Sequence, residues 1–178
     1  MPASLPAFAD VVVIGGGIMG TSTAWQLARA GAGRVVLLDQ ATIAAGASGW
    51  TGALLRRHYT NMPEATLAHR SHLIFRNWAE EVGGDCGFVP HGLIVTVDQS
   101  PEVSGNIELL ARNVENLKTI GVETEVITAD ELKQLQPWCA VDDIQTCAYE
   151  PMSGYVDAPQ ATRSMADAAE RAGATIHE

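Results

Sequence analysis

Two short apolar runs flank a glycine-rich segment near the start of the chain. Residues 11–14 read Val-Val-Val-Ile and residues 35–38 read Val-Val-Leu-Leu, the continuous pattern expected of parallel strands buried on both faces. Residues 21–30 between them are good helix formers, and Gly31 and Gly33 end the predicted helix. Strand, turn, helix and strand in this order predict a βαβ unit.

Helical and extended patterns alternate through the rest of the chain. A helix with proline in its first turn is expected after residue 61, and its apolar positions predict one buried stripe. The members of that stripe are Leu67, Ile74, Trp78 and Val82. After residue 83 the sequence predicts a strand at 93–97, a helix from Ser100, a capping box at Thr128–Glu131 and a helix capped by Asp157.

Residues 174–177 look like a third strand of the first sheet. The fold class is therefore α/β: a Rossmann-like parallel sheet with an inserted α+β domain. We predict residues 1–82 and 151–178 as two parts of one nucleotide-binding domain and residues 83–150 as the insertion. Because a helix leads into a strand that has only begun, the second part looks incomplete and the chain looks truncated.

Composition excludes several classes of protein. The 178 residues are 47% hydrophobic and 18% charged, which predicts a folded core rather than disorder. Eleven Lys and Arg against 21 Asp and Glu give a net charge of −10, so nucleic acid is not an expected partner. No signal peptide or membrane span is recognisable, and three cysteines without CxxC spacing suit a reducing compartment, so a cytoplasmic location is expected.

Gly15, Gly17 and Gly20 form a GxGxxG motif between the first strand and the helix, and Asp39 ends the second strand. In such motifs the first glycine permits a tight turn, the second allows a pyrophosphate to approach the backbone, and the third allows close helix packing. The acid would accept hydrogen bonds from an adenosine ribose. No Lys or Arg follows Asp39 to bind a 2′-phosphate, so NADP is disfavoured while NAD and FAD both remain.

Four segments together resemble one known family. They are GGGIMG, the loop GASGWTGALLRRHY, the strand GFVPHGLIVTV and GYVDAPQATRSMADAAERAGATIHE. In this order they resemble the FAD-dependent amine oxidoreductases of the D-amino acid oxidase superfamily, and most closely the sarcosine oxidase β-subunit and dimethylglycine dehydrogenase-like flavoproteins. The resemblance covers only the N-terminal half of such proteins, and it implies an FAD-binding sheet with a substrate domain as the insertion.

The resemblance implies a set of site residues. FAD would contact the glycine turn, the end of the second strand, where the family usually has Glu, and the loop that follows. The predicted cofactor-binding residues are Gly15, Gly17, Ile18, Met19, Gly20, Asp39, Gln40, Ala47, Ser48, Gly49 and Thr51. The predicted catalytic residues are Arg56, Arg57 and His58, where a positive charge could stabilise an anionic reduced flavin.

Two departures from the family pattern imply that FAD is not covalently attached. Relatives with histidyl-FAD have histidine in a loop of the type STWHAAG, and Thr51 stands at that place here. Relatives that attach FMN have histidine just before the acid that matches Asp157, and this chain has Val156. No metal site is expected either, because His69 and His72 have no obvious third ligand beside them.

The implied reaction is oxidation of the C–N bond of a small amino acid or N-methylated amino acid, with hydride transfer to flavin N5. The expected partner is thus a small-molecule amine. Two alternatives stay open at this point. The chain could be an NAD-linked dehydrogenase, because both cofactors use the same turn, or a non-catalytic cofactor-binding chain that needs a C-terminal half or partner subunit.

Overall fold

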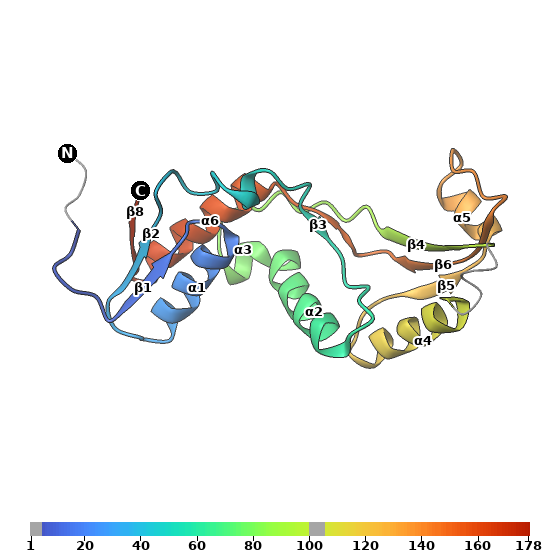
Figure 1. Cartoon of the computed structure of the whole chain (residues 1–178), viewed down its shortest axis with the longest axis horizontal. Coiled ribbons are helices and arrows are strands. Elements are labelled where there is room, and N and C mark those ends of the chain that lie inside the picture. The colour runs from blue at the N-terminus through green and yellow to red at the C-terminus, as the bar shows by residue number, and fades with distance from the viewer. Residues whose placement is uncertain (1–4, 100–105) are drawn as a thin grey trace. The chain divides into compact units, whose positions relative to one another are not determined.

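The computed structural model describes residues 5–99 and 106–178. The chain divides into two compact units (Figure 1). The first contains Met1–Ala53, Ile74–Phe88 and Val156–Glu178, and the second contains Leu54–Leu73 and Val89–Tyr155. Residues 54–73, which the predicted domain division places in the nucleotide-binding part, belong to the second compact unit.

The first unit is built on a three-stranded parallel sheet in the order β1-β2-β8. Its strands are β1 (Val11–Ile14), β2 (Val35–Leu38) and β8 (Thr175–His177), with Val12 opposite Val36 and Leu37 opposite Ile176. All three predicted strands and their parallel pairing are confirmed. The central strand β2 is buried along its first three residues, as expected of a strand covered on both faces.

Helices α1 (Ile18–Arg29), α3 (Trp78–Glu81) and α6 (Ala158–Arg171) complete this unit. Helix α6 is rich in alanine and buries a stripe that includes Ala161, Met165 and Ala169. Small side chains let α1 and α6 approach closely. Asp157 caps α6 as predicted, since its Oδ1 atom accepts a hydrogen bond from the N–H of Gln160 at 2.8 Å.

The second unit contains an antiparallel sheet in the order β4-β6-β5, made of β4 (Leu93–Asp98), β6 (Ile144–Glu150) and β5 (Glu125–Ile127). Helices α4 (Asn106–Thr119) and α5 (Ala129–Leu135) pack on it. The predicted strand at 93–97 and the predicted capping box at Thr128–Glu131 are confirmed, and α4 buries Leu110, Val114 and Leu117. The predicted helix start at Ser100 lies outside the described residues.

Two further elements belong to the segment that follows β2. The 3₁₀ turn η1 (Ala47–Gly49) lies in the first unit, and the short strand β3 (Leu54–Leu55) pairs with β7 (Gly154–Tyr155) in the second. This segment contains little regular structure, as its glycine- and alanine-rich sequence indicates.

The predicted stripe through Leu67, Ile74, Trp78 and Val82 is wrong in part. Leu67 is 65% exposed, and α2 (Met62–Arg76) buries Ala65 and His72 instead. The physical reason is the face that α2 buries: Ala65 and His72, seven residues apart, share one side of the helix, and Leu67 lies on the other. Trp78 belongs to the next helix, because α2 ends at Arg76 and α3 begins at Trp78. No helix in the described ranges is both long and apolar enough to cross a membrane.

Candidate functional site

The glycine turn joins β1 to α1 in a conformation that excludes side chains at two positions. Gly15 has a φ of +110°, which L-residues rarely adopt, and its N–H donates to the carbonyl of Leu38 at 2.8 Å. A Cβ atom at Gly20 would collide with the carbonyl oxygen of Gly15. The turn and the first turn of α1 therefore pack backbone against backbone.

Ser48 lies at the N-terminus of α1. Gly17 is the N-cap and makes no side-chain capping bond, but the Oγ atom of Ser48 accepts a hydrogen bond from the N–H of Ile18 at 2.9 Å. A Cβ at Gly17 would lie 3.1 Å from that oxygen. The turn η1 thus reaches the end of the helix at which unpaired N–H groups and the helix dipole favour an anion.

Asp39 contacts the glycine turn directly. Its Oδ2 atom accepts a hydrogen bond from the N–H of Gly16 at 2.5 Å, and its Oδ1 atom accepts one from Ala41 at 2.7 Å. These backbone N–H groups stabilise the carboxylate, so the pKa of Asp39 lies below its usual 3.8. Asp39 is therefore ionised at neutral pH.

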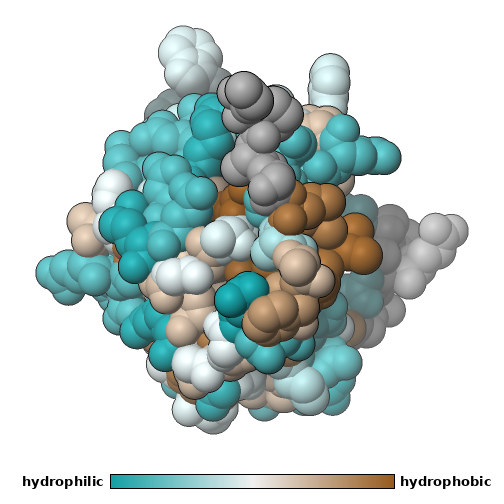
Figure 2. Space-filling view, turned by 90° about the vertical axis from the view of Figure 1, so that its left-hand side faces the viewer, coloured by the Kyte–Doolittle hydropathy of each residue, from teal (hydrophilic) through white to brown (hydrophobic). Residues whose placement is uncertain are grey.

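A cavity of about 450 Å³ opens at the carboxyl ends of β1 and β2. Its lining residues are Ile14, Gly15, Leu38, Asp39, Gln40, Ala41, Ala45 and Gly46. Ligands of open α/β sheets bind at this edge. Ile14 is 85% exposed, and Figure 2, which faces this end of the chain, shows brown apolar surface among teal polar atoms. The cavity thus offers one apolar contact surface beside one carboxylate.

Two further predicted cofactor-binding residues, Met19 and Thr51, are exposed to solvent. Met19 is 77% exposed at the start of α1, and Thr51 is also exposed, with its Oγ1 atom accepting a hydrogen bond from Ala53 at 3.1 Å. Ala47 and Gly49 lie with Ser48 in η1. These residues lie in the same compact unit as the glycine turn, and their part in cofactor binding stays a prediction.

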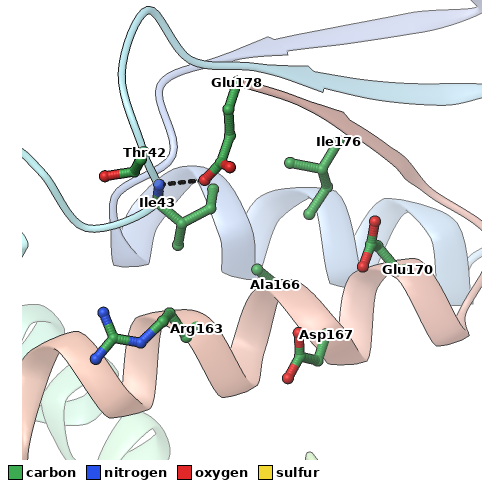
Figure 3. A pocket seen from close by; sticks show the side chains of 8 residues that line it. All are labelled: Thr42, Ile43, Arg163, Ala166, Asp167, Glu170, Ile176 and Glu178. Carbon is green, nitrogen blue, oxygen red and sulfur yellow. Dashed lines mark hydrogen bonds between the residues drawn. The ribbon is translucent and has the colours of Figure 1, made fainter. Parts of the chain in front are cut away.

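A second cavity of this unit, about 420 Å³ in volume, is lined mainly by polar residues. The α6 side chains Arg163, Asp167 and Glu170 line it, and Glu178 accepts a hydrogen bond from the N–H of Ile43 at 2.5 Å (Figure 3). No glycine turn or helix N-terminus lines this cavity. It is therefore a weaker candidate for a dinucleotide site than the cavity beside Asp39.

The three predicted catalytic residues all lie in the second unit, but the surroundings of their side chains differ. Arg56 is exposed and its guanidinium lies over the ring of Tyr59, 4.7 Å from the centroid. Arg57 is 1% exposed, and its backbone N–H donates to the Oε2 atom of Glu150 at 3.1 Å. Arg56 is thus the arginine of the pair that remains accessible to a ligand.

His58 is buried. Loss of solvent lowers the pKa of His58 below its usual 6.5; the negative charge of Glu150 acts in the opposite direction, and the positive charge of Arg56 lowers the pKa further. The imidazole is therefore neutral at pH 7.

Sequence reasoning missed Glu150, which is fully buried beside Arg57 although 93 residues separate them in the chain. The one available signal was an acid at the end of an otherwise uncharged strand. The Nε2 atom of His72 lies 2.7 Å from the carbonyl oxygen of Met152. Among residues 5–99 and 106–178, no three His, Cys, Asp or Glu residues are grouped so that they could hold a metal ion.

Comparison with known proteins decides the family. Residues 10–178 match the sequence profile of the family described as DAO, FAD dependent oxidoreductase. The chain belongs to this family. The resemblance seen in the sequence is thereby confirmed, and FAD rather than NAD is the family's cofactor.

Two curated relatives illustrate the range of this oxidoreductase family. The chain is 31% identical over 175 residues to mitochondrial sarcosine dehydrogenase of Homo sapiens, covering 98% of this chain and 19% of that protein. It is 29% identical over 175 residues to the mitochondrial pyruvate dehydrogenase phosphatase regulatory subunit of Mus musculus, covering 98% and 20%. The chain therefore spans about a fifth of the length of these relatives.

Solved structures of the family share the fold. L-proline dehydrogenase from P. horikoshii superposes with a TM-score of 0.87 at 27% identity, covering 98% of this chain and 45% of that one. Glycine oxidase from Geobacillus kaustophilus gives a TM-score of 0.76 at 29% identity, covering 95% and 46%. The predicted α/β fold class is confirmed, and the chain corresponds to less than half of either structure.

The residues of the first unit fit FAD. The turn has no room for a side chain at Gly20, the N-terminus of α1 lacks a capping side chain of its own, and an ionised acid ends β2. These are the features that bind a dinucleotide by its diphosphate and its adenosine ribose.

Proposed function

We propose that this chain contributes the FAD-binding sheet and part of the substrate domain of an amine oxidoreductase. The reaction is oxidation of the C–N bond of a small amino acid or N-methylated amino acid, with hydride leaving the carbon beside nitrogen. The observation that carries the proposal is the Gly15–Gly20 turn with Asp39 bonded to it, in a chain of the FAD dependent oxidoreductase family.

The diphosphate of FAD is bound at the N-terminus of α1. Backbone N–H groups of the glycine turn and the positive end of the helix attract its charge. Ser48 adds a donor: its Oγ atom already accepts from Ile18, so its own proton can be donated to a phosphate oxygen. Gly17 lets the diphosphate approach the backbone closely.

Asp39 binds the adenosine ribose. Each carboxylate oxygen can accept more than one hydrogen bond, so ribose hydroxyls can bind while Gly16 and Ala41 keep their bonds to the same group. The cavity beside Asp39 takes the adenosine, with Ile14 as apolar contact and Gln40 at the rim.

FAD, when bound, supplies the hydride acceptor at flavin N5. Arg56 would provide a positive charge that stabilises negative charge developing during the reaction. His58, neutral because burial lowers its pKa, is able to accept a proton. The backbone N–H of Arg57 donates to Glu150, and this bond holds the backbone between Arg56 and His58.

The attachment of FAD is non-covalent in this proposal. Thr51 stands where relatives with histidyl-FAD have histidine, and a threonine hydroxyl is not a nucleophile of comparable strength. Val156, the residue before the α6 cap, likewise has no nucleophilic atom with which to attach a second flavin.

The proposal is tested by flavin binding and reduction. The purified chain is incubated with FAD, desalted and examined for flavin absorbance, and acid precipitation should release all of the flavin into the supernatant. Sarcosine, dimethylglycine, glycine and proline are then added without oxygen, and one of them should bleach the flavin. A chain that stays colourless with FAD but binds NAD would overturn the proposal, and flavin in the acid pellet would overturn the non-covalent attachment.

A second candidate is a cofactor-binding chain that is inactive without a partner polypeptide. It is favoured by one relative, 29% identical over 175 residues, that is described as a regulatory subunit. Flavin binding without bleaching, followed by bleaching only after co-expression with a C-terminal half taken from a solved relative, is the outcome expected of it.

A further inference from the structure

A buried polar cluster surrounds the contact between Arg57 and Glu150 in the second unit. Arg57, Glu150 and Ser153 are 1%, 0% and 0% exposed. The Oε2 atom of Glu150 accepts hydrogen bonds from the backbone N–H of Arg57 at 3.1 Å and from the hydroxyl of Ser153 at 2.6 Å. The Nε atom of Arg57 lies 3.9 Å from the same oxygen.

Burying this cluster costs free energy of desolvation that an apolar core would not. Removing a carboxylate and a guanidinium from water costs several kcal/mol each, and apolar residues of similar volume often stabilise a protein equally well. The Oε1 atom of Glu150 also lacks a hydrogen-bond partner among the residues described. Stability alone is therefore a poor explanation for Glu150, and its contacts point to a positional role.

The contacts of Glu150 fix the backbone that follows β3. The ladder between β3 and β7 is only two residues long, at Leu54–Leu55 and Gly154–Tyr155. After Leu55, the N–H of Arg57 is bonded to the side chain of Glu150 instead of to a strand.

Glu150 is itself part of a strand and a turn. It ends β6, where it pairs with Leu93 of β4, and its carbonyl accepts a bond from Ser153 at 3.3 Å. Ser153 in turn accepts a bond at its carbonyl from Gly92 at 2.7 Å. Glu150 therefore joins the segment 56–58 to the end of β6 and to the turn that follows it.

We propose that Glu150 is a positioning residue that fixes, through the backbone of Arg57, the segment from which Arg56 and His58 project. The contact to Arg57 stands on geometry alone. Its consequence for catalysis rests on the proposed function, which assigns Arg56 and His58 to the flavin chemistry. Two charged groups act on the pKa of His58 in opposite directions: Glu150 raises it and Arg56 lowers it.

The experiment compares three variants by amide hydrogen exchange. Glu150→Leu removes the acceptor at similar volume, Glu150→Gln keeps a weaker neutral acceptor, and Ser153→Ala is the matched control that removes another donor of Glu150. The Arg57 amide should exchange about tenfold faster or more in Glu150→Leu, less so in Glu150→Gln, and at the wild-type rate in Ser153→Ala. Protection of the β4–β6 amides shows that the unit is folded.

A second readout is the titration of His58, followed by NMR. Because the Glu150 carboxylate raises the pKa of His58, Glu150→Gln should lower that pKa, whereas Ser153→Ala should leave it unchanged. If Glu150→Leu loses β4–β6 protection, Glu150→Gln decides the matter by these two measurements. Wild-type exchange at Arg57 together with a wild-type His58 titration in Glu150→Gln would overturn the inference.

A third readout links the contact to chemistry. In the flavin-loaded protein, Glu150→Gln should retain FAD but slow flavin reduction by the amine severalfold, through the rate constant rather than through substrate affinity. Faster Arg57 exchange with an unchanged reduction rate would overturn the catalytic consequence. Failure of the wild-type chain to bind FAD would overturn the proposed function and leave the Arg57 exchange result intact, so the two failures are distinguishable.

Discussion

The carboxylate of Asp39 is bonded to the backbone of Gly16: Oδ2 accepts the Gly16 N–H at 2.5 Å, while Oδ1 accepts that of Ala41. The residue expected to bind ribose at the end of β2 is thus also a structural contact of the turn expected to bind diphosphate. The two parts of the proposed dinucleotide site are therefore connected by a hydrogen bond within the protein.

This contact predicts a pH dependence of stability. The backbone bonds lower the pKa of Asp39 in the folded chain below its usual 3.8, so their stabilisation is complete above that value and is lost as pH falls through the depressed pKa. Asp39→Asn should therefore have a lower urea midpoint than wild type at about pH 7, and the difference should shrink in strong acid.

The control for this measurement is Asp142→Asn, which changes an exposed carboxylate in the other unit. It should have the wild-type midpoint at both pH values. An Asp39→Asn deficit of equal size at neutral and acid pH would contradict the role assigned to the ionised carboxylate.

A second prediction concerns Gly20. Its Cβ would meet the carbonyl oxygen of Gly15, which is backbone and cannot rotate away. Gly20→Ala should therefore shift the turn, lower the free energy of unfolding by about 1–3 kcal/mol and abolish retention of FAD after desalting. Gly52→Ala is the matched control, since nothing lies within 4 Å of a Cβ there, and it should retain FAD. Equal flavin retention in the two variants would argue against this turn as the diphosphate site.

The first unit could be predicted from sequence because its signals are local. The apolar runs of β1 and β2, the glycine motif and Asp39 occur within about thirty residues, and the Asp157 cap is followed directly by its helix. The hydrogen bond between Asp39 and Gly16 could not be predicted, since it depends on which way a short side chain turns at the end of a strand.

The second unit was less predictable because its important contacts join residues that are far apart in the sequence. Glu150 meets Arg57 across 93 residues of chain, so neither sequence window contains both partners. Leu67 was wrong as a core position because α2 buries the face with Ala65 and His72, a small and a polar residue that apolar spacing does not select. Short strands such as β5 (Glu125–Ile127) become strands by pairing with β6 and have no strong pattern of their own.

A third prediction concerns a buried bond between α3 and α6. The indole N–H of Trp78, a residue only 3% exposed, donates to the Oγ atom of Ser164 at 2.9 Å, and that hydroxyl donates to the carbonyl of Gly83 at 2.9 Å. Ser164→Ala leaves both groups without this partner and should cost about 1–3 kcal/mol of unfolding free energy. Ser164→Thr keeps the hydroxyl and should recover part of the loss. The urea midpoint checks both, and wild-type stability of Ser164→Ala would show that water replaces the hydroxyl.

The last prediction separates Arg56 from its buried neighbour. Arg56 is exposed and stacked on Tyr59, so Arg56→Gln should leave the fold and FAD retention unchanged. If its charge stabilises the reduced flavin, the variant should be reduced by the amine about a hundredfold more slowly and at a lower reduction potential, as when one charge-stabilising donor is removed from an active site. Arg56→Lys keeps the charge without the planar stacking and should be intermediate.

The matched control is Arg112→Gln, which removes an exposed arginine from α4 and lowers the net charge by the same amount. Anaerobic stopped-flow absorbance and potentiometry of the two variants decide the question. A general effect of net charge would slow both equally, whereas a charge acting on the flavin slows Arg56→Gln alone. Equal reduction rates and potentials in the two variants would remove Arg56 from the chemistry and leave His58 as the remaining candidate of the three.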